Sequence, residues 1–255
     1  MNKILVIASL TVREAIRDRI LYLLLFFAIA LITTSLAISK LYIGDEMKII
    51  KDFGLSSISF FGVLIAIFIG IGLLYKEIDK KTVYIMIAKP LERYHFIIGK
   101  YLGLLFTLFT IWLIMSIVFS LFVLFKGGWE NKLLWALLAI YLEYIIITGV
   151  AILFSTFTTP ILSSIFSLGI FFVGHFIEGF KMLAKKFEDA PIIQSVIMFF
   201  FYFFPNLERF NLRGAVVHGD FINPSQVLIL ILYACTYSIC LLLVGIAIFQ
   251  RRNFI

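Results

Sequence analysis

Charged side chains are scarce in this sequence, where Asp, Glu, Lys and Arg together make up only 15% of the 255 residues. Apolar residues make up 62%, and the mean hydropathy of +1.09 lies far above that of soluble globular domains. This composition excludes an ordinary soluble protein and indicates a polytopic, all-α membrane protein. We expect no cleavable signal peptide, because the first strongly apolar run begins only at Ile20 and is too long for one.

Motifs of nucleotide, zinc and serine-hydrolase chemistry are missing as well. The string nearest to a P-loop, "IIGKYLG", has Tyr101 where a magnesium-binding hydroxyl is needed, and HExxH, CxxC and GxSxG are absent. The two cysteines, Cys235 and Cys240, are five residues apart, so they do not share a helix face and are expected to be small apolar side chains. We therefore predict no catalytic residues, no metal and no cofactor on this chain.

Long apolar runs dominate what is present. Six of them reach the roughly 20 residues that a helix needs to cross a membrane. They are 20–38, 53–75, 101–125, 133–153, 161–180 and 227–249. The sequence thus predicts one transmembrane domain over 1–255.

The net charge of +7 comes from basic residues scattered among the loops, which argues against nucleic-acid binding. Arg13, Arg17 and Arg19 near the start and "QRRNFI" at the end indicate that both termini are cytoplasmic, since cytoplasmic flanks are enriched in Lys and Arg.

Two segments outside these runs are also expected to be helical. Residues 1–19 alternate apolar and charged positions with helical spacing, which favours an amphipathic elbow helix; the alternative is a plain basic flank of the first span. In the external loop 181–226, the run "IIQSVIMFFFYFF" ends at Pro205. Its 13 residues rise only about 20 Å as a helix, so we predict a re-entrant or interfacial element.

Polar and small residues inside the spans are candidates for function or packing. Glu143 falls at the middle of the fourth span, where it is either a proton or substrate site or a neutral acid bonded to another helix, since no basic partner is expected at that depth. His175 and Glu178 share a helix face and are expected to form a hydrogen-bonded pair, because a metal site would need a third ligand. The second span carries a stripe of small residues that favours helix packing over a substrate path. This stripe consists of Gly62, Ala66 and Gly70.

The charged segment 76–100 separates the second and third spans. A helix over 79–88 is expected to stop before Lys89-Pro90, because the residue before a proline is pushed out of the helical region. Such a short helix across the cytoplasmic mouth is either a lever for a soluble partner or an ordinary interfacial loop.

The string "KEIDKKTVYIMIAKPLERYHFIIGKYLG" resembles the coupling region of ATP-binding-cassette (ABC) type-2 permeases, with their (K/S)P-x-x-R-Y turn and GK-(Y/F)-x-G. The resemblance continues through "EYIIITGVAILFSTFTTP", "GIFFVGH", "FFPNLERFNLR" and "FQRRNFI", so it covers nearly the full chain. It is nearest to the subgroup that includes the membrane subunit used in nitrous-oxide reductase copper-site maturation. Glu92 departs from the pattern, which has small residues before the arginine.

The resemblance implies the membrane subunit of an ABC exporter in a prokaryotic cytoplasmic membrane. Two copies would pair among membrane lipids, and each would dock a cytoplasmic ABC ATPase that holds the ATP and magnesium. It assigns coupling to seven positions, to which helical periodicity adds Asp79 and Lys80. The seven are Glu77, Lys81, Thr82, Pro90, Arg93, Gly99 and Lys100. The external re-entrant element would include Pro205, Asn206, Glu208 and Arg209.

Two other classes of protein stay open from the residues alone. A proton-coupled secondary transporter would use Glu143, and an intramembrane enzyme would use His175 and Glu178. Neither the transported substrate nor its direction of transport follows from the apolar spans.

Overall fold

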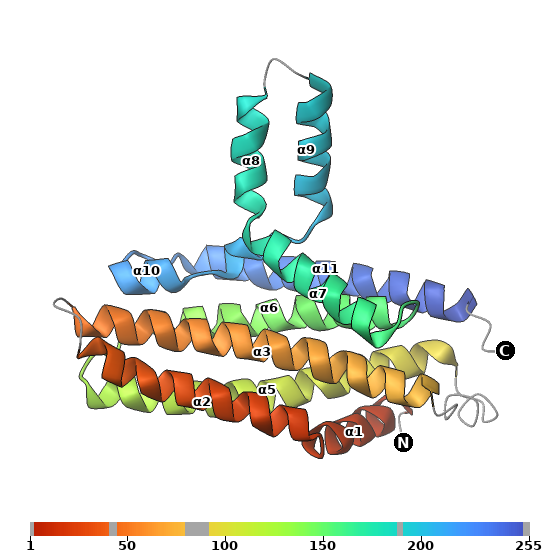
Figure 1. Ribbon diagram of the computed structural model, residues 1–255, viewed down its shortest axis with the longest axis horizontal. Helices are drawn as coiled ribbons and strands as arrows, with labels where there is room; N and C mark the ends of the chain where they lie inside the picture. The colour runs from red at the N-terminus through yellow and green to blue at the C-terminus, as the bar shows by residue number, and fades with distance from the viewer. Residues whose placement is uncertain (1–2, 41–44, 80–91, 188–190, 252–255) are drawn as a thin grey trace.

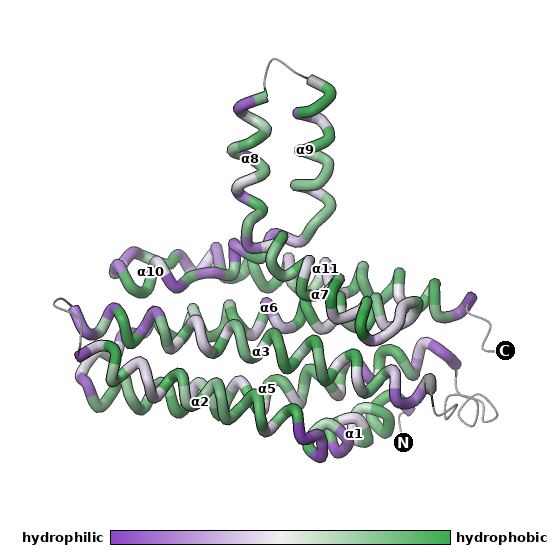
Figure 2. Tube along the Cα trace, viewed as in Figure 1, coloured by the Kyte–Doolittle hydropathy of each residue, from purple (hydrophilic) through white to green (hydrophobic). Residues whose placement is uncertain are grey.

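The computed structural model describes residues 3–40, 45–79, 92–187 and 191–251, and all regular structure within them is helical. Most helices run side by side in one elongated bundle, and the hairpin of α8 and α9 stands away from it across its long axis (Figure 1). In chain order the elements are α1 Lys3–Ile16, α2 Arg19–Ser39, α3 Glu46–Asp79, α5 Arg93–Phe125, α6 Lys132–Ser155, α7 Pro160–His175, α8 Ile177–Lys186, α9 Pro191–Phe203, η1 Glu208–Phe210, α10 Arg213–His218 and α11 Pro224–Arg251. Polar residues gather at the two ends of the bundle and around the base of the hairpin (Figure 2).

Five of these helices are long and apolar enough to cross a membrane, namely α2, α3, α5, α6 and α11. A sixth span exists only if α7 and α8 count as one, and these two helices are bent by 56° at their junction. The all-helical class is confirmed with five unbroken spans, and the sixth predicted span, over 161–180, is divided by this bend. Helices α3 and α5 also extend well beyond their apolar runs toward the segment 80–91.

Helix α6 forms the centre of the bundle, because it is buried on nearly all sides between α3, α5, α7 and α11. Close packing against α3 depends on Gly62, whose missing side chain leaves room for the ring of Tyr144. The Tyr144 hydroxyl donates a hydrogen bond to the carbonyl of Ile58, 2.5 Å away. Ala66 is fully buried, and a Cβ atom at Gly70 would lie 3.7 Å from Ala151. The small-residue stripe therefore faces the neighbouring helices.

Helix α1 packs along α5 at the end of the bundle where α11 also ends (Figure 1). Its buried face has one residue at every fourth position, namely Ile7, Thr11 and Ala15. Leu5, an apolar residue of this amphipathic segment, lies outside that face and is 64% exposed. A Cβ atom at Gly103 would lie 2.6 Å from the Ala8 carbonyl oxygen, so glycine is what lets α1 approach so closely.

Helix α9 has 13 residues and therefore falls short of a span, as its length predicts. It pairs with α8, while the segment after it enters the bundle without regular structure. Leu207 and Phe210 are almost completely buried there. These two side chains anchor the segment in the bundle.

Candidate functional site

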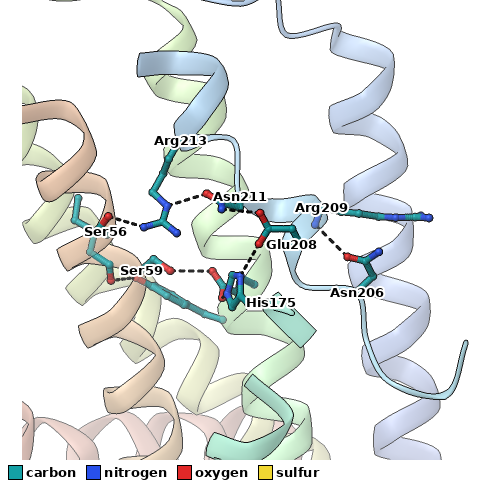
Figure 3. A network of polar contacts seen from close by, with 11 residues as sticks. Ser56, Ser59, His175, Asn206, Glu208, Arg209, Asn211 and Arg213 are labelled. Atoms are coloured by element: carbon teal, nitrogen blue, oxygen red, sulfur yellow. Dashed lines mark hydrogen bonds and ion pairs between the residues drawn. The ribbon is translucent and has the colours of Figure 1, made fainter. Parts of the chain in front are cut away.

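A network of polar side chains crosses the apolar bundle near the base of the hairpin (Figure 3). Its deepest member is Glu143 on α6, which is 2% exposed. One carboxylate oxygen accepts a hydrogen bond from the hydroxyl of Ser59 on α3 at 3.1 Å. The other lies 2.8 Å from Nε2 of His175, the last residue of α7. A carboxylate at this depth is costly unless it is paired, and both of its oxygens have a partner.

His175 joins this buried carboxylate to a second one. Its Nδ1 atom lies 3.1 Å from an oxygen of Glu208, in the short helix η1. Both acceptors are carboxylates, so the protonated imidazolium, which donates from both nitrogens, satisfies both contacts. The exposed side-chain fraction rises from 3% at Glu143 to 17% at His175 and 37% at Glu208. The three groups thus form a path from the bundle interior toward its surface.

Three further residues lead the network back to α3, where the helix backbone between Ser56 and Ser59 closes it into a ring. Glu208 accepts from the amide of Asn211 at 2.9 Å, and Asn211 accepts from Nε of Arg213 at 2.8 Å. Arg213 donates from Nη1 to Ser56, which lies on α3 three residues before Ser59. The ring therefore links α3, α6, α7, η1 and α10 through hydrogen bonds (Figure 3).

The structure pairs these residues differently from our expectation. Glu178 lies beyond the bend and accepts a hydrogen bond from Asn206 at 3.1 Å, so the expected pair of His175 with Glu178 is wrong. His175 instead pairs with Glu143, although no basic partner was expected at that depth. In the described part of the chain, no group of three His, Cys, Asp or Glu side chains could hold a metal ion.

Residues of the expected external re-entrant element are anchored to α11. The backbone N–H of Asn206 donates to the Tyr233 hydroxyl of α11 at 2.9 Å, and Arg209 lies over the Tyr233 ring at 5.9 Å. Pro205 is buried at the end of the hairpin. Ser59 was not among the predicted site residues, because the sequence shows it only as a hydroxyl within an apolar run.

A second cluster lies at the end of the bundle where α3 ends and α5 begins. Lys100 is only 2% exposed and bridges two acids from different helices. Its Nζ atom lies 2.6 Å from Glu77 on α3 and 3.2 Å from Glu14 on α1. Gly99, next to Lys100, packs against Ile7, where a Cβ atom would come within 2.7 Å of the Ile7 Cβ. Glu77 and Lys100, both predicted coupling residues, therefore meet in one ion-pair cluster.

Two more contacts tie helices together at this end. Asp18 accepts hydrogen bonds from Lys76 at 2.9 Å and from the backbone of Ile20 at 3.1 Å. Burial alone would raise the pKa of Asp18, but these hydrogen bonds and the Lys76 charge outweigh it and hold the pKa below its ordinary value. Arg93, at the start of α5, donates to the carbonyls of Phe249 and Gln250 at the end of α11.

The remaining predicted coupling residues lie where side chains are not described. The predicted helix over 79–88 falls there, except that the backbone of Asp79 ends α3. The others are Lys80, Lys81, Thr82 and Pro90, within 80–91.

Comparison with known proteins adds the family. A family model described as ABC-2 family transporter protein matches residues 5–254. No curated protein matches the sequence. The match extends over α1, the bundle, the hairpin and α11, and so includes both clusters described above. The chain is thus a member of the ABC-2 family of membrane transporter proteins.

Proposed function

We propose that this chain is the permease subunit of an ABC exporter, driven by a separate cytoplasmic ATPase that docks on residues 79–93. ABC-2 membrane proteins act with ABC ATPases, which agrees with the missing P-loop. The observation that carries the proposal is the convergence of α1, α3, α5 and α11 at one end of the bundle. There Lys100, Lys76 and Arg93 tie these helices together. A movement applied between the end of α3 and the start of α5 would reach all four helices.

This geometry divides the predicted coupling residues into two roles. Lys100 is buried and already paired with Glu77, so we assign it to transmitting movement between helices rather than to contacting the ATPase. Contact with the ATPase is assigned to Asp79, Lys80 and Lys81, which place one acid and two bases at consecutive positions.

Co-purification with a co-expressed cytoplasmic ABC ATPase tests the proposal. Lys81→Glu should abolish the association and the stimulation of ATP hydrolysis by the permease. Lys48→Glu is the matched control, because Lys48 is an exposed lysine near the opposite end of α3 and should leave both unchanged. If Lys81→Glu retains full association and stimulation, the docking assignment is wrong.

We also propose that two copies pair in a prokaryotic cytoplasmic membrane, with both termini in the cytoplasm. The resemblance to type-2 permeases supports the pairing, and the basic flanks support the orientation. Light scattering of the purified protein should give the molar mass of two chains, and a monomer mass would contradict pairing. A fluorescent protein fused after Ile255 should fluoresce if this end is cytoplasmic.

Proton-coupled transport is a second candidate, favoured by the path from Glu208 through His175 to Glu143. A chain of titratable groups between the surface and a buried carboxylate is what a proton relay needs. Glu143→Gln should then abolish proton-linked transport in vesicles without ATP. Unchanged transport would exclude this candidate and leave the ABC mechanism intact.

A further inference from the structure

A cavity of about 350 Å³ opens beside the polar ring, between α3, α7 and α10. Its lining divides into a polar half and an aromatic half. The polar half consists of Ser56, Ser59, His175 and Arg213. The aromatic half consists of Phe60, Phe171, Phe172 and Phe176. Such a lining suits a molecule with a polar head and an apolar chain.

Arg213 decides the charge of that head. Both of its bonded partners are neutral, namely the Asn211 amide oxygen and the Ser56 hydroxyl. Within the described ranges, no carboxylate lies within salt-bridge distance of its guanidinium, and Glu208 is reached only through Asn211. A guanidinium presents five N–H donors in a planar fork that matches phosphate and carboxylate, so this one is unsaturated.

The acidic members of the ring do not oppose an anion in this cavity. Glu143 and Glu208 are absent from the lining, and an oxygen of each lies against a ring nitrogen of His175. Ser56 accepts the Arg213 bond, and its own hydroxyl hydrogen has no acceptor in the described part of the chain. An oxyanion at the cavity mouth would accept from both Arg213 and Ser56.

The aromatic half supplies the surface for the apolar chain. Phe172 is 50% exposed and Phe176 is 72% exposed, although both lie next to a charged ring. Such rings offer an apolar surface against which an alkyl chain can pack. We infer that the cavity between α3, α7 and α10 binds an amphiphile with an anionic phosphate or carboxylate head, which pairs with Arg213, and an alkyl chain, which covers the phenylalanines.

Binding of dodecyl phosphate to the full-length protein in neutral dodecyl maltoside, followed by native mass spectrometry, tests the inference. Wild-type protein should bind dodecyl phosphate, and Arg213→Gln should weaken binding at least tenfold, because it removes the charge-assisted bond. Arg209→Gln is the matched control and should bind as wild type, since Arg209 lies over Tyr233 and lines a different cavity. Equal binding by Arg213→Gln and wild type would overturn the inference.

A second variant guards against misfolding of the first. Phe172→Ala removes a half-exposed ring, leaves the polar ring unchanged and should weaken binding severalfold. Dodecyl trimethylammonium should not bind, and binding as tight as that of the phosphate would also overturn the inference.

Competition with phosphatidylglycerol identifies the source of the ligand. Displacement of dodecyl phosphate by this lipid indicates a bilayer lipid, whereas no displacement indicates a free amphiphile, and either result keeps the anionic head. The measurement needs no ATPase, so its failure would leave the permease proposal standing.

Discussion

The buried ammonium of Lys100 provides the sharpest test of the cluster that ties α1, α3 and α5 together. Replacing it by Met keeps the length of the side chain but leaves two acids facing an apolar group. The Glu77 side chain is 16% exposed and the Glu14 side chain is 38% exposed. Losing the Lys100 ammonium therefore costs more stability at Glu77 than at Glu14. The comparison of single and double variants therefore separates a buried pair from a solvent-screened one.

The magnitudes follow from these exposures. Removing one partner of a buried pair costs about 3–5 kcal/mol, and since Glu77 keeps some contact with water, we expect about 3 kcal/mol for Lys100→Met. Glu14→Gln should cost less than about 1 kcal/mol, because water screens that pair. The double variant Lys100→Met with Glu77→Met should be close to wild type, since an apolar pair can replace a buried ion pair at little cost.

Unfolding in mixed micelles with a rising fraction of sodium dodecyl sulfate, followed by tryptophan fluorescence, gives these differences. Lys126→Met is the matched control at the other end of the bundle, where the Lys126–Glu46 pair is exposed on both sides. It should cost less than about 1 kcal/mol. The reasoning is refuted if Lys100→Met unfolds like this control, or if the double variant is less stable than the single one.

Three further predictions concern other contacts. Glu143→Leu should lower the free energy of unfolding by about 1–3 kcal/mol more than Glu143→Gln, because leucine leaves a His175 nitrogen without a partner; equal losses in the same titration would contradict the buried hydrogen bond. Gly103→Val should push α1 off α5 at a cost of about 1–3 kcal/mol and speed proteolysis of α1; wild-type proteolysis would contradict that packing. Lys76→Gln should raise the pKa of Asp18, measured by carboxylate carbon NMR, because burial then dominates. In the wild type, the stability from this contact is present above the ordinary pKa of 3.8 and is lost as the pH falls through the lowered value; an unchanged Asp18 pKa in Lys76→Gln would contradict the ion pair.

Hydropathy alone predicts the long spans, because a membrane leaves an apolar run of this length little choice but a helix. It predicts their ends less well. Helix α5 begins at Arg93, eight residues before its apolar run, since helical backbone continues in water once Arg93 and Lys100 have partners in the bundle. These partners are distant in sequence, so the hydropathy of the run does not indicate them.

Periodicity also predicts an amphipathic α1 without identifying its inner face. Leu5 and Ile16 are apolar and exposed, while a different face of α1 is buried against the apolar bundle. Contact with α5 selects the face with Thr11 because Gly103 allows the backbones to meet there. Burial against protein and burial against lipid look alike in a sequence, and only packing distinguishes them.

The bend after α7 has a backbone cause that also explains the polar ring. In a continuous helix the carbonyl of Gly174 would accept from the N–H of Glu178, four residues on. Here it accepts from Leu207 at 3.1 Å, so a segment 33 residues away ends the helix. A Cβ atom at Gly174 would lie 2.7 Å from Leu207, so the close approach needs glycine at this position. The same insertion brings η1 to the end of α7 and sets Glu208 beside His175, so the bend and the polar ring are consequences of one contact.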